Sequence, residues 1–279
     1  MSKAKPAAGS LRPLAERADR HRLYELSVQC PEAEVDFVDR AYRCLRGRSA
    51  RLLREDFCGT ASVCCEWVRR RKTNRAIGVD IDGEVLDWGR AHNLASLPEQ
   101  AARRVTLLRK NVLDVETPAP DVITAMNFSY WLISERSALK RYFRRVRDRL
   151  KDQGVFFLDA YGGYDSYRVV TEERSIQGDG GPFTYIWEQE RYDPITGRLV
   201  CHIHFEFPDG SRLERAFSYD WRLWSLPEIR ELLAEVGFKR VICYWQGWDE
   251  DGNPDGVFVP AEEGEPDAGW IAYLTAEKR

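Results

Sequence analysis

The sequence predicts an α/β protein whose central sheet is mostly parallel. Short apolar runs alternate with stretches of helical periodicity through residue 163, which is typical of βαβ units. The predicted strands span 51–55, 76–79, 105–108, 121–126 and 155–158, with two more at 241–245 and 270–274. Between these groups, three extended segments indicate an antiparallel insertion. A chain of 279 residues that is 43% hydrophobic can bury the core that such a fold needs.

The predicted helices follow the spacing of apolar side chains. Two helices over 19–46 are separated at Pro31, which suits a first helical turn. Further helices are expected over 61–71, around 85–91, and over 136–150, where Gly154 follows. Residues 225–228 (Ser-Leu-Pro-Glu) have the spacing of a capping box and should open a helix that ends at Gly237.

The extended segments of the insertion cover 183–192, 198–207 and 212–224. Turn-forming residues separate them at 193–197 and 208–211, so the segments should form an antiparallel meander. Residues 249–267 contain eight acidic residues and no Lys or Arg, which predicts a long solvated loop.

Composition disfavours several classes of protein. The formal net charge of −3 gives no global attraction to nucleic acid or anionic membrane, and no apolar run is long enough to span a bilayer. The first ten residues lack the apolar stretch of a signal peptide, so a cytoplasmic location is expected. The seven cysteines are odd in number and form no C-x-x-C pair, so a disulfide framework is not expected. Five are predicted to be buried, reduced thiols: Cys44, Cys58, Cys64, Cys201 and Cys243.

Candidate ligand-binding residues follow the first four strands. Ligands of open α/β sheets bind beyond the carboxyl ends of the strands. Gly59 lets the backbone approach a ligand closely, and Asp80 can accept both hydroxyls of a ribose. The offset of 25 residues from Glu55 to Asp80 suits a dinucleotide fingerprint, but Gly59 alone stands where that fingerprint needs three glycines. The pattern therefore favours a nucleoside ligand without phosphates and argues against a dehydrogenase.

Residues 53–61 (LREDFCGTA) resemble motif I of the class I S-adenosylmethionine-dependent methyltransferases, an acidic residue followed by x-G-x-G-x-G. Glu55 takes the acidic position and Gly59 the central glycine, whereas Phe57 and Ala61 replace the outer glycines. Residues 78–81 are similar to the second motif of that family, whose acidic residue binds the ribose. The resemblance implies these cofactor-binding residues: Arg54, Glu55, Phe57, Cys58, Gly59, Thr60, Asp80, Ile81, Asn111, Val112 and Asn127.

The same resemblance implies the overall organisation. It predicts a Rossmann-like methyltransferase core with a mostly parallel seven-stranded sheet, with S-adenosylmethionine as cofactor and S-adenosylhomocysteine as product. Residues 1–49 form a tail and a helical lid, 50–163 the cofactor-binding core, 164–224 the antiparallel insertion on the substrate side, and 225–279 the rest of the core. The insertion resembles the substrate-side additions of glycine and deoxysugar N-methyltransferases.

Methyl transfer from a sulfonium is an in-line displacement, so the protein must mainly align the nucleophile and exclude water. A base is needed only for a protonated acceptor, which could be N, O or C. His21 has a pKa suited to a base near neutrality, and Tyr130 and Tyr161 complete the predicted catalytic residues. The predicted substrate contacts are Tyr24, Trp131 and Tyr164.

Alternatives remain open at this stage. A small-molecule substrate is preferred over RNA or protein, because the basic helix over 136–151 has its apolar stripe committed to the core. The insertion could instead form a homodimer interface. His202 and His204 could ligate a metal, but the sequence offers no evident third ligand, and no metal requirement is expected. Cys58 is expected to be a small buried residue, not a nucleophile.

Overall fold

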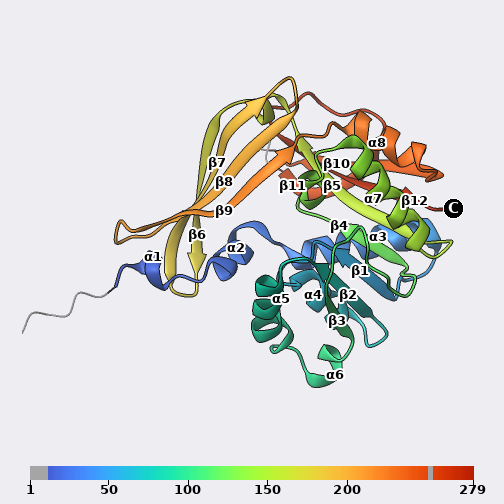
Figure 1. The fold of residues 1–279 in the computed structure, drawn as a ribbon, viewed down its shortest axis with the longest axis horizontal. Helices are drawn as coiled ribbons and strands as arrows, with labels where there is room; N and C mark the ends of the chain where they lie inside the picture. Colours follow the sequence, from blue (N-terminus) through green and yellow to red (C-terminus); the bar gives the residue numbers. More distant parts are fainter. Residues whose placement is uncertain (1–11, 251–253) are drawn as a thin grey trace, which may run out of the picture.

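The computed structural model describes residues 12–250 and 254–279, which contain two β-sheets (Figure 1). The larger sheet has eight strands in the order β11-β10-β12-β5-β4-β1-β2-β3. Strands β5, β4, β1, β2 and β3 are mutually parallel, and β12, β10 and β11 add antiparallel pairs at the other side. In that order along the sheet the strands are Pro254–Ala261, Arg240–Trp248, Trp270–Glu277, Val155–Gly162, Val122–Ala125, Leu52–Asp56, Arg75–Asp80 and Val105–Arg109. The predicted α/β class with a mostly parallel sheet is confirmed.

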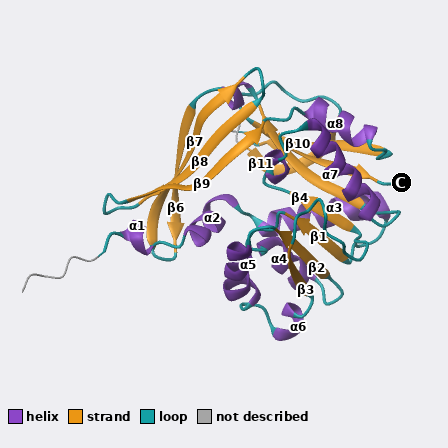
Figure 2. Ribbon diagram, in the orientation of Figure 1, coloured by secondary structure: helices purple, strands orange, loops and turns teal. Residues whose placement is uncertain are grey.

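The second sheet is antiparallel and is made of β6 (Val170–Gly178), β7 (Gly181–Asp193), β8 (Arg198–Glu206) and β9 (Arg212–Arg222) (Figure 2). It leaves the core directly after β5 and returns before α8 (Leu226–Glu235). The predicted insertion is therefore present, with one more strand than expected. Strand β6 was missed because nearly all of its side chains are polar and exposed, so it has no apolar alternation.

The expectations for residues 249–267 and for two of the cysteines were wrong. The segment expected to be a solvated loop contains β11, which pairs with β10 and gives the sheet an eighth strand. The acidic residues obscured the short run Val257–Phe258–Val259, whose Phe258 packs on Phe37 and Tyr273. The prediction that Cys44 and Cys243 are buried was also wrong, since Cys44 is exposed and Cys243 is half-buried; Cys58, Cys64 and Cys201 are buried as predicted.

Helices cover both faces of the large sheet. The N-terminal helices α2 (Arg20–Val28) and α3 (Pro31–Arg46) divide at Pro31, as predicted. The helices of one face include α3 and α4 (Ser62–Arg70), and those of the other are α7 (Arg136–Arg149) and α8. The remaining helical segments are α1 (Leu14–Arg17), α5 (Gly83–Gly89), η1 (Arg90–Leu94), α6 (Glu99–Ala102), η2 (Ser129–Leu132) and η3 (Tyr164–Tyr167).

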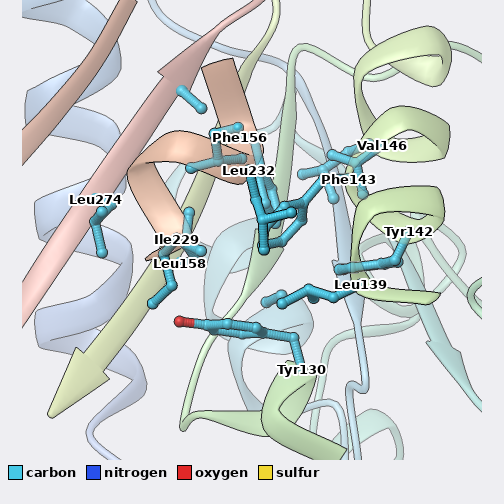
Figure 3. Packing of buried hydrophobic residues seen from close by; sticks show 14 of the residues in the cluster. Tyr130, Leu139, Tyr142, Phe143, Val146, Phe156, Leu158, Ile229, Leu232 and Leu274 are labelled. Carbon is cyan, nitrogen blue, oxygen red and sulfur yellow. The ribbon is translucent and has the colours of Figure 1, made fainter. Parts of the chain in front are cut away.

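The core under α7 and α8 is packed with aromatic and branched side chains. Figure 3 shows Phe143 and Val146 of α7 and Leu232 of α8 gathered around Phe156 of β5, and all four are buried. Helix α8 begins with the predicted capping box at Ser225, whose hydroxyl accepts the N–H of Glu228. In the described residues, no helix combines the length and apolarity needed to cross a bilayer.

Candidate active site

The loop after β1 contains a single glycine, yet its backbone has the conformation of a glycine-rich loop. Phe57, Gly59 and Ala61 all have positive φ, at 59°, 50° and 60°. These are the three positions where the resembling motif has glycine. Left-handed backbone disfavours residues with a Cβ, so Phe57 and Ala61 hold this conformation against strain. The space where a Gly59 Cβ would lie is open, with no described atom within 4 Å, so a ligand can approach the backbone there.

Asp80, at the end of β2, fixes this loop. Its Oδ2 accepts the N–H of Gly59 at 2.8 Å and its Oδ1 accepts the N–H of Asp82 at 2.9 Å. A carboxylate has about four acceptor positions, so Asp80 retains capacity for further hydrogen bonds. Next to it, Ile81 is 67% exposed, which makes an apolar surface available at the edge of the sheet.

Three other predicted cofactor residues have roles inside the protein. Glu55 is buried and accepts the N–H of Cys64 at the start of α4, and burial raises the pKa of its carboxyl to about 7. The Arg54 guanidinium is 1% exposed and binds Asp56, to which Tyr142 also donates. Burial also raises the pKa of the Cys58 thiol, so it is not a thiolate nucleophile.

The remaining predicted cofactor residues flank the same edge. Asn111 follows β3, is exposed, and uses its Oδ1 to accept the N–H of Leu113. Val112 is buried beside it. The Thr60 hydroxyl donates to Glu25 of α2 at 2.7 Å. The order β4-β1-β2-β3 therefore brings the residues that follow these strands to one edge of the sheet.

A second strained turn follows β4. Asn127 and Phe128 both have φ of 56°, and their N–H groups donate to the two oxygens of Asp159 on β5, at 2.8 and 2.9 Å. Burial raises the pKa of Asp159 to about 7, although these two donors oppose the rise. Consecutive left-handed residues without glycine are costly, and here one carboxylate holds them in place. The turn carries the Asn127 side chain to the rim of a cavity.

That cavity has a volume of about 540 Å³ and lies between the antiparallel sheet and the carboxyl ends of β4 and β5. Its walls come from α2, α3, the strained turn, the inner face of β7–β9 and β12. Aromatic rings make up much of the lining: Tyr24, Phe128, Tyr161, Tyr185, Trp187, Tyr219, Trp221, Trp248, Trp270 and Tyr273. The volume suits a small organic molecule.

Glu34 of α3, which the sequence analysis missed, also lines the cavity. Its side chain is buried, and its Oε2 has no hydrogen-bond partner among the described residues. Burial, followed by the charges of Glu55 and Asp159, raises the pKa of Glu34 to about 8, and a hydrogen bond from Asn127 opposes this. Glu34 and Asp159 of the lining thus lie within electrostatic range of each other and of Glu55, and all three carboxyl groups have raised pKa values.

The structure separates the predicted catalytic and substrate residues. Tyr24 and Tyr161 line the cavity. Tyr130 is fully buried and donates its hydroxyl to the Asp159 carbonyl, and Figure 3 shows its ring beside Leu139 and Leu158. Trp131 is also buried and does not line the cavity, and Tyr164 is 61% exposed. His21 is not among the cavity-lining residues: its ring lies 5.5 Å from Trp88 and 5.9 Å from Phe217.

Helix α2 connects the loop after β1 to the antiparallel sheet. In Figure 1 it lies between the large sheet and the antiparallel sheet. On one side, Glu25 accepts hydrogen bonds from Thr60 and from Asn93. On the other, Leu23 packs with buried residues of the second sheet, including Ile203. Arg174 of β6 donates to the Ser27 carbonyl. The helix therefore contacts both the loop after β1 and the second sheet, and its role as a lid stays a prediction.

His202 and His204 lie on the face of the second sheet that is opposite to the cavity. Both are buried and bonded to side chains, His202 to Glu190 and Ser218, and His204 to Glu188 and Glu214. Among the residues that the structure describes, no group of three metal-ligand side chains has the arrangement of a metal site.

Comparison with known proteins gives structural neighbours only. No protein-family model and no curated protein matches the sequence. The fold is similar to an S-adenosylmethionine-dependent methyltransferase from Clostridium acetobutylicum (18% identity, TM-score 0.64, covering 92% of this chain and 97% of that one). It is also similar to an amino pentose methyltransferase from Micromonospora echinaspora with bound S-adenosylmethionine (13%, 0.66, 92% and 95%). A sugar N-methyltransferase from Streptoalloteichus is a third neighbour (16%, 0.59, 98% and 97%).

Proposed function

We propose that this chain, which has the fold of the S-adenosylmethionine-dependent methyltransferases, transfers a methyl group from S-adenosylmethionine to a small molecule. The observation that carries the proposal is the meeting of two features at one sheet edge. The loop over 57–61 retains the positive φ values of a glycine-rich cofactor loop, and the strained turn at Asn127 opens onto an aromatic cavity.

The residues of the edge fit a nucleoside cofactor. Asp80 would accept the ribose hydroxyls with its remaining acceptor positions, and the open backbone at Gly59 would lie against the cofactor. Ile81 offers an apolar surface for the adenine, beside Asn111 and Val112. Bound S-adenosylmethionine supplies a methyl group on a positively charged sulfur, which is already reactive toward a nucleophile.

The protein's own task is then to orient the acceptor and to exclude water. The cavity lies beside Asn127 and Asp159 and is roofed by the second sheet, so an acceptor within it would face the cofactor edge. Its size suits a small molecule. The neighbours named as amino pentose and sugar N-methyltransferases support an acceptor of that size.

A polymer substrate has less support. The basic helix α7 is largely engaged within the protein: Arg136 and Lys140 pair with Glu235, and Arg149 pairs with Glu116. Charges that are already paired offer little attraction to RNA.

Binding calorimetry with S-adenosylmethionine, S-adenosylhomocysteine and NAD tests the cofactor assignment. We expect both sulfur compounds to bind and NAD not to bind. A folded protein that binds NAD, or none of the three, would contradict the proposal. A screen of small amines, phenols and alcohols for methyl acceptance would then identify the acceptor class.

A further inference from the structure

We infer that the substrate is a cationic amine and that Glu34 accepts the proton that its nitrogen must lose before methylation. The inference rests on the proposed function and adds to it the chemical class of the acceptor and a base that was not predicted. Four features of the cavity support it: the position of Glu34, its unpartnered oxygen, the sign of the surrounding charges, and the aromatic lining.

The position of Glu34 combines burial with access to the cavity. The residue is 6% exposed, yet it belongs to the cavity wall. It lies next to Asn127, in the turn that joins the cofactor edge to the cavity. A buried carboxyl oxygen without a partner costs free energy, and most such atoms in native proteins are satisfied. An ammonium N–H from the substrate would supply the missing partner.

The charges around Glu34 favour a cation. The cavity lining contains four carboxyl groups, those of Glu34, Asp159, Asp165 and Glu172, and one basic side chain, Arg174. Arg174 is held by the Ser27 carbonyl and lies 4.8 Å from the centre of the Tyr185 ring. Asp165 pairs with Arg168 outside the lining. The charges that act most on Glu34 are those of the Glu55 and Asp159 carboxylates, which are negative when ionised and would also attract a cation.

The aromatic lining gives the same preference. A desolvated ammonium is stabilised by the faces of tryptophan and tyrosine rings, to a greater extent than at exposed sites. Tyr24 of α2 and Tyr273 of β12 both lie within electrostatic range of Glu34 and of Asp159. Burial raises the pKa of both phenols, so they remain neutral and present rings, not charges, near Glu34. An anionic substrate would find one basic side chain, Arg174, against four carboxyl groups in this lining.

The proton transfer balances without any further reactant. The Glu34 carboxylate takes one proton from the substrate ammonium, which leaves a neutral amine with a free lone pair and a neutral carboxylic acid. The nitrogen lone pair then forms the new N–C bond as the S–C bond of the methyl donor breaks and its electrons return to sulfur. The product is a protonated methylamine, and Glu34 releases its proton to water after the product leaves. A carboxyl with a pKa of about 8 is well matched to this task near neutral pH.

The test uses the full-length protein loaded with S-adenosylhomocysteine, and benzylamine and benzyl alcohol as a matched pair of probes. We expect the wild type to bind benzylamine at least tenfold more tightly than benzyl alcohol. In Glu34→Gln, benzylamine binding should weaken at least tenfold, while the affinities for benzyl alcohol and S-adenosylhomocysteine stay within about threefold. Glu32→Gln, an exposed carboxyl two residues away on the same helix, is the control and should behave as wild type.

The pH dependence provides a readout that a structural role would not change. In the wild type, benzylamine affinity should rise as the pH increases from about 6 to about 8, because Glu34 must ionise to pair with the ammonium. In Glu34→Gln only the smaller contribution of Asp159 and Glu55 should remain. Once an amine acceptor is identified, the variant should lose at least a hundredfold in kcat near neutral pH and recover part of it at higher pH, where the free amine is abundant.

The outcomes separate the two proposals. If the folded wild type fails to bind S-adenosylhomocysteine, the proposed function fails. If it binds S-adenosylhomocysteine but shows no preference for benzylamine over benzyl alcohol, only the amine inference fails. A loss of S-adenosylhomocysteine affinity in Glu34→Gln beyond tenfold would overturn the assignment of Glu34, because its carboxylate would then serve the amino group of the cofactor.

Discussion

At the scale of single residues, the loop after β1 has left-handed backbone angles at two positions where the resembling motif would have glycine and this chain does not. Phe57 and Ala61 take the left-handed angles that the resembling motif normally gives to glycine. Non-glycine residues pay roughly 1–2 kcal/mol each for this region. A hydrogen bond from the Gly59 N–H to the Asp80 carboxylate helps to stabilise the strained loop. The retained geometry supports a retained ligand, since strain of this kind concentrates at functional sites.

Asp80→Ala should weaken binding of S-adenosylhomocysteine by tenfold or more. The carboxylate would be lost from the ribose and from the Gly59 N–H, and each charge-assisted hydrogen bond is worth about 1.5–3 kcal/mol. Calorimetry on the folded variant measures the effect. Asp82→Ala is the control, because Asp82 caps α5 and should cost only about 1 kcal/mol of stability. Wild-type affinity in Asp80→Ala would remove this residue from the cofactor site.

Gly59→Val should fold but fail to bind the cofactor. No described atom outside the neighbouring residues lies within 4 Å of the added Cβ, so the main expected cost to stability is backbone strain of roughly 1–2 kcal/mol. The branched side chain would instead occupy the space of the ligand. Thermal unfolding and S-adenosylhomocysteine titration measure the two effects separately. Tight binding by the variant would place the cofactor elsewhere.

Glu34→Gln should stabilise the ligand-free protein at alkaline pH and leave it unchanged at acid pH. The folded-state pKa of Glu34, about 8, is above its ordinary value of 4.5, so the folded protein holds the proton longer than the unfolded chain does. Stability is therefore lost as the pH rises from about 4.5 to 8, by up to roughly 1.4 kcal/mol per pH unit. Denaturant titrations of both proteins at several pH values should diverge across this window. Parallel curves would mean that Glu34 is not buried as a neutral acid.

Some residues of the candidate site could be proposed from the sequence, and others could not. The residues after β1 and β2 could be proposed from the sequence because they lie at fixed positions in consecutive βα units, and their role in binding stays a prediction. Glu34 was not identifiable, since it sits in a helix beside the core residues Val35 and Val38 and carries no local signal. Tyr130 and Trp131 were expected at the site because they follow β4, but a 3-10 turn directs both into the core.

At the scale of elements, α2 connects the loop after β1 to the cavity. Its Glu25 accepts a hydrogen bond from Thr60 in that loop, and its Tyr24 lines the cavity. The sequence predicted the helix, yet periodicity could not indicate what it packs against. Strand β6 was missed because it is mostly polar, and β11 because its apolar run over 257–259 is short and flanked by Asp, Gly and Pro. Each strand lies at the edge of its sheet.

Glu25→Ala should loosen α2 and speed cofactor release. The substitution removes the acceptor for Thr60 and Asn93 but leaves the packing of Leu23 intact. Amide hydrogen exchange over 20–28 should become faster, and the dissociation rate of S-adenosylhomocysteine should rise severalfold. Glu16→Ala in α1 is a suitable control, because it is exposed and outside these contacts. Unchanged exchange and unchanged release would show that the helix is not a lid.

At the scale of the whole molecule, the eight-stranded sheet is complete without the second sheet. Every pairing in the large sheet is among strands that lie outside 164–224. The second sheet nevertheless has two attachments. Leu199 and Cys201 contribute to the core cluster under α7 and α8, and Phe183 and Phe205 hold the inner side of α2. The insertion is therefore not needed for the strand pairing of the large sheet, although it contributes side chains to the core and packs against α2.

Replacing 175–219 with a short Gly/Ser linker tests whether the insertion serves the cavity and α2 and is not needed to form the large sheet. The replacement keeps Trp221 and Trp224, which belong to the core, but removes Leu199 and Cys201, so the protein should fold with a lower Tm. Methyl transfer should be lost, because β7, β8 and most of β9 form one wall of the cavity. Cofactor affinity should fall only as far as it falls in Glu25→Ala, because both changes free α2 from one of its two supports. Combining the two changes should then add little, since a helix that is already released cannot be released again. If the losses instead add fully, the second sheet contacts the cofactor directly. If the replacement yields an active monomer from a dimer, the insertion is a subunit interface and the acceptor binds elsewhere.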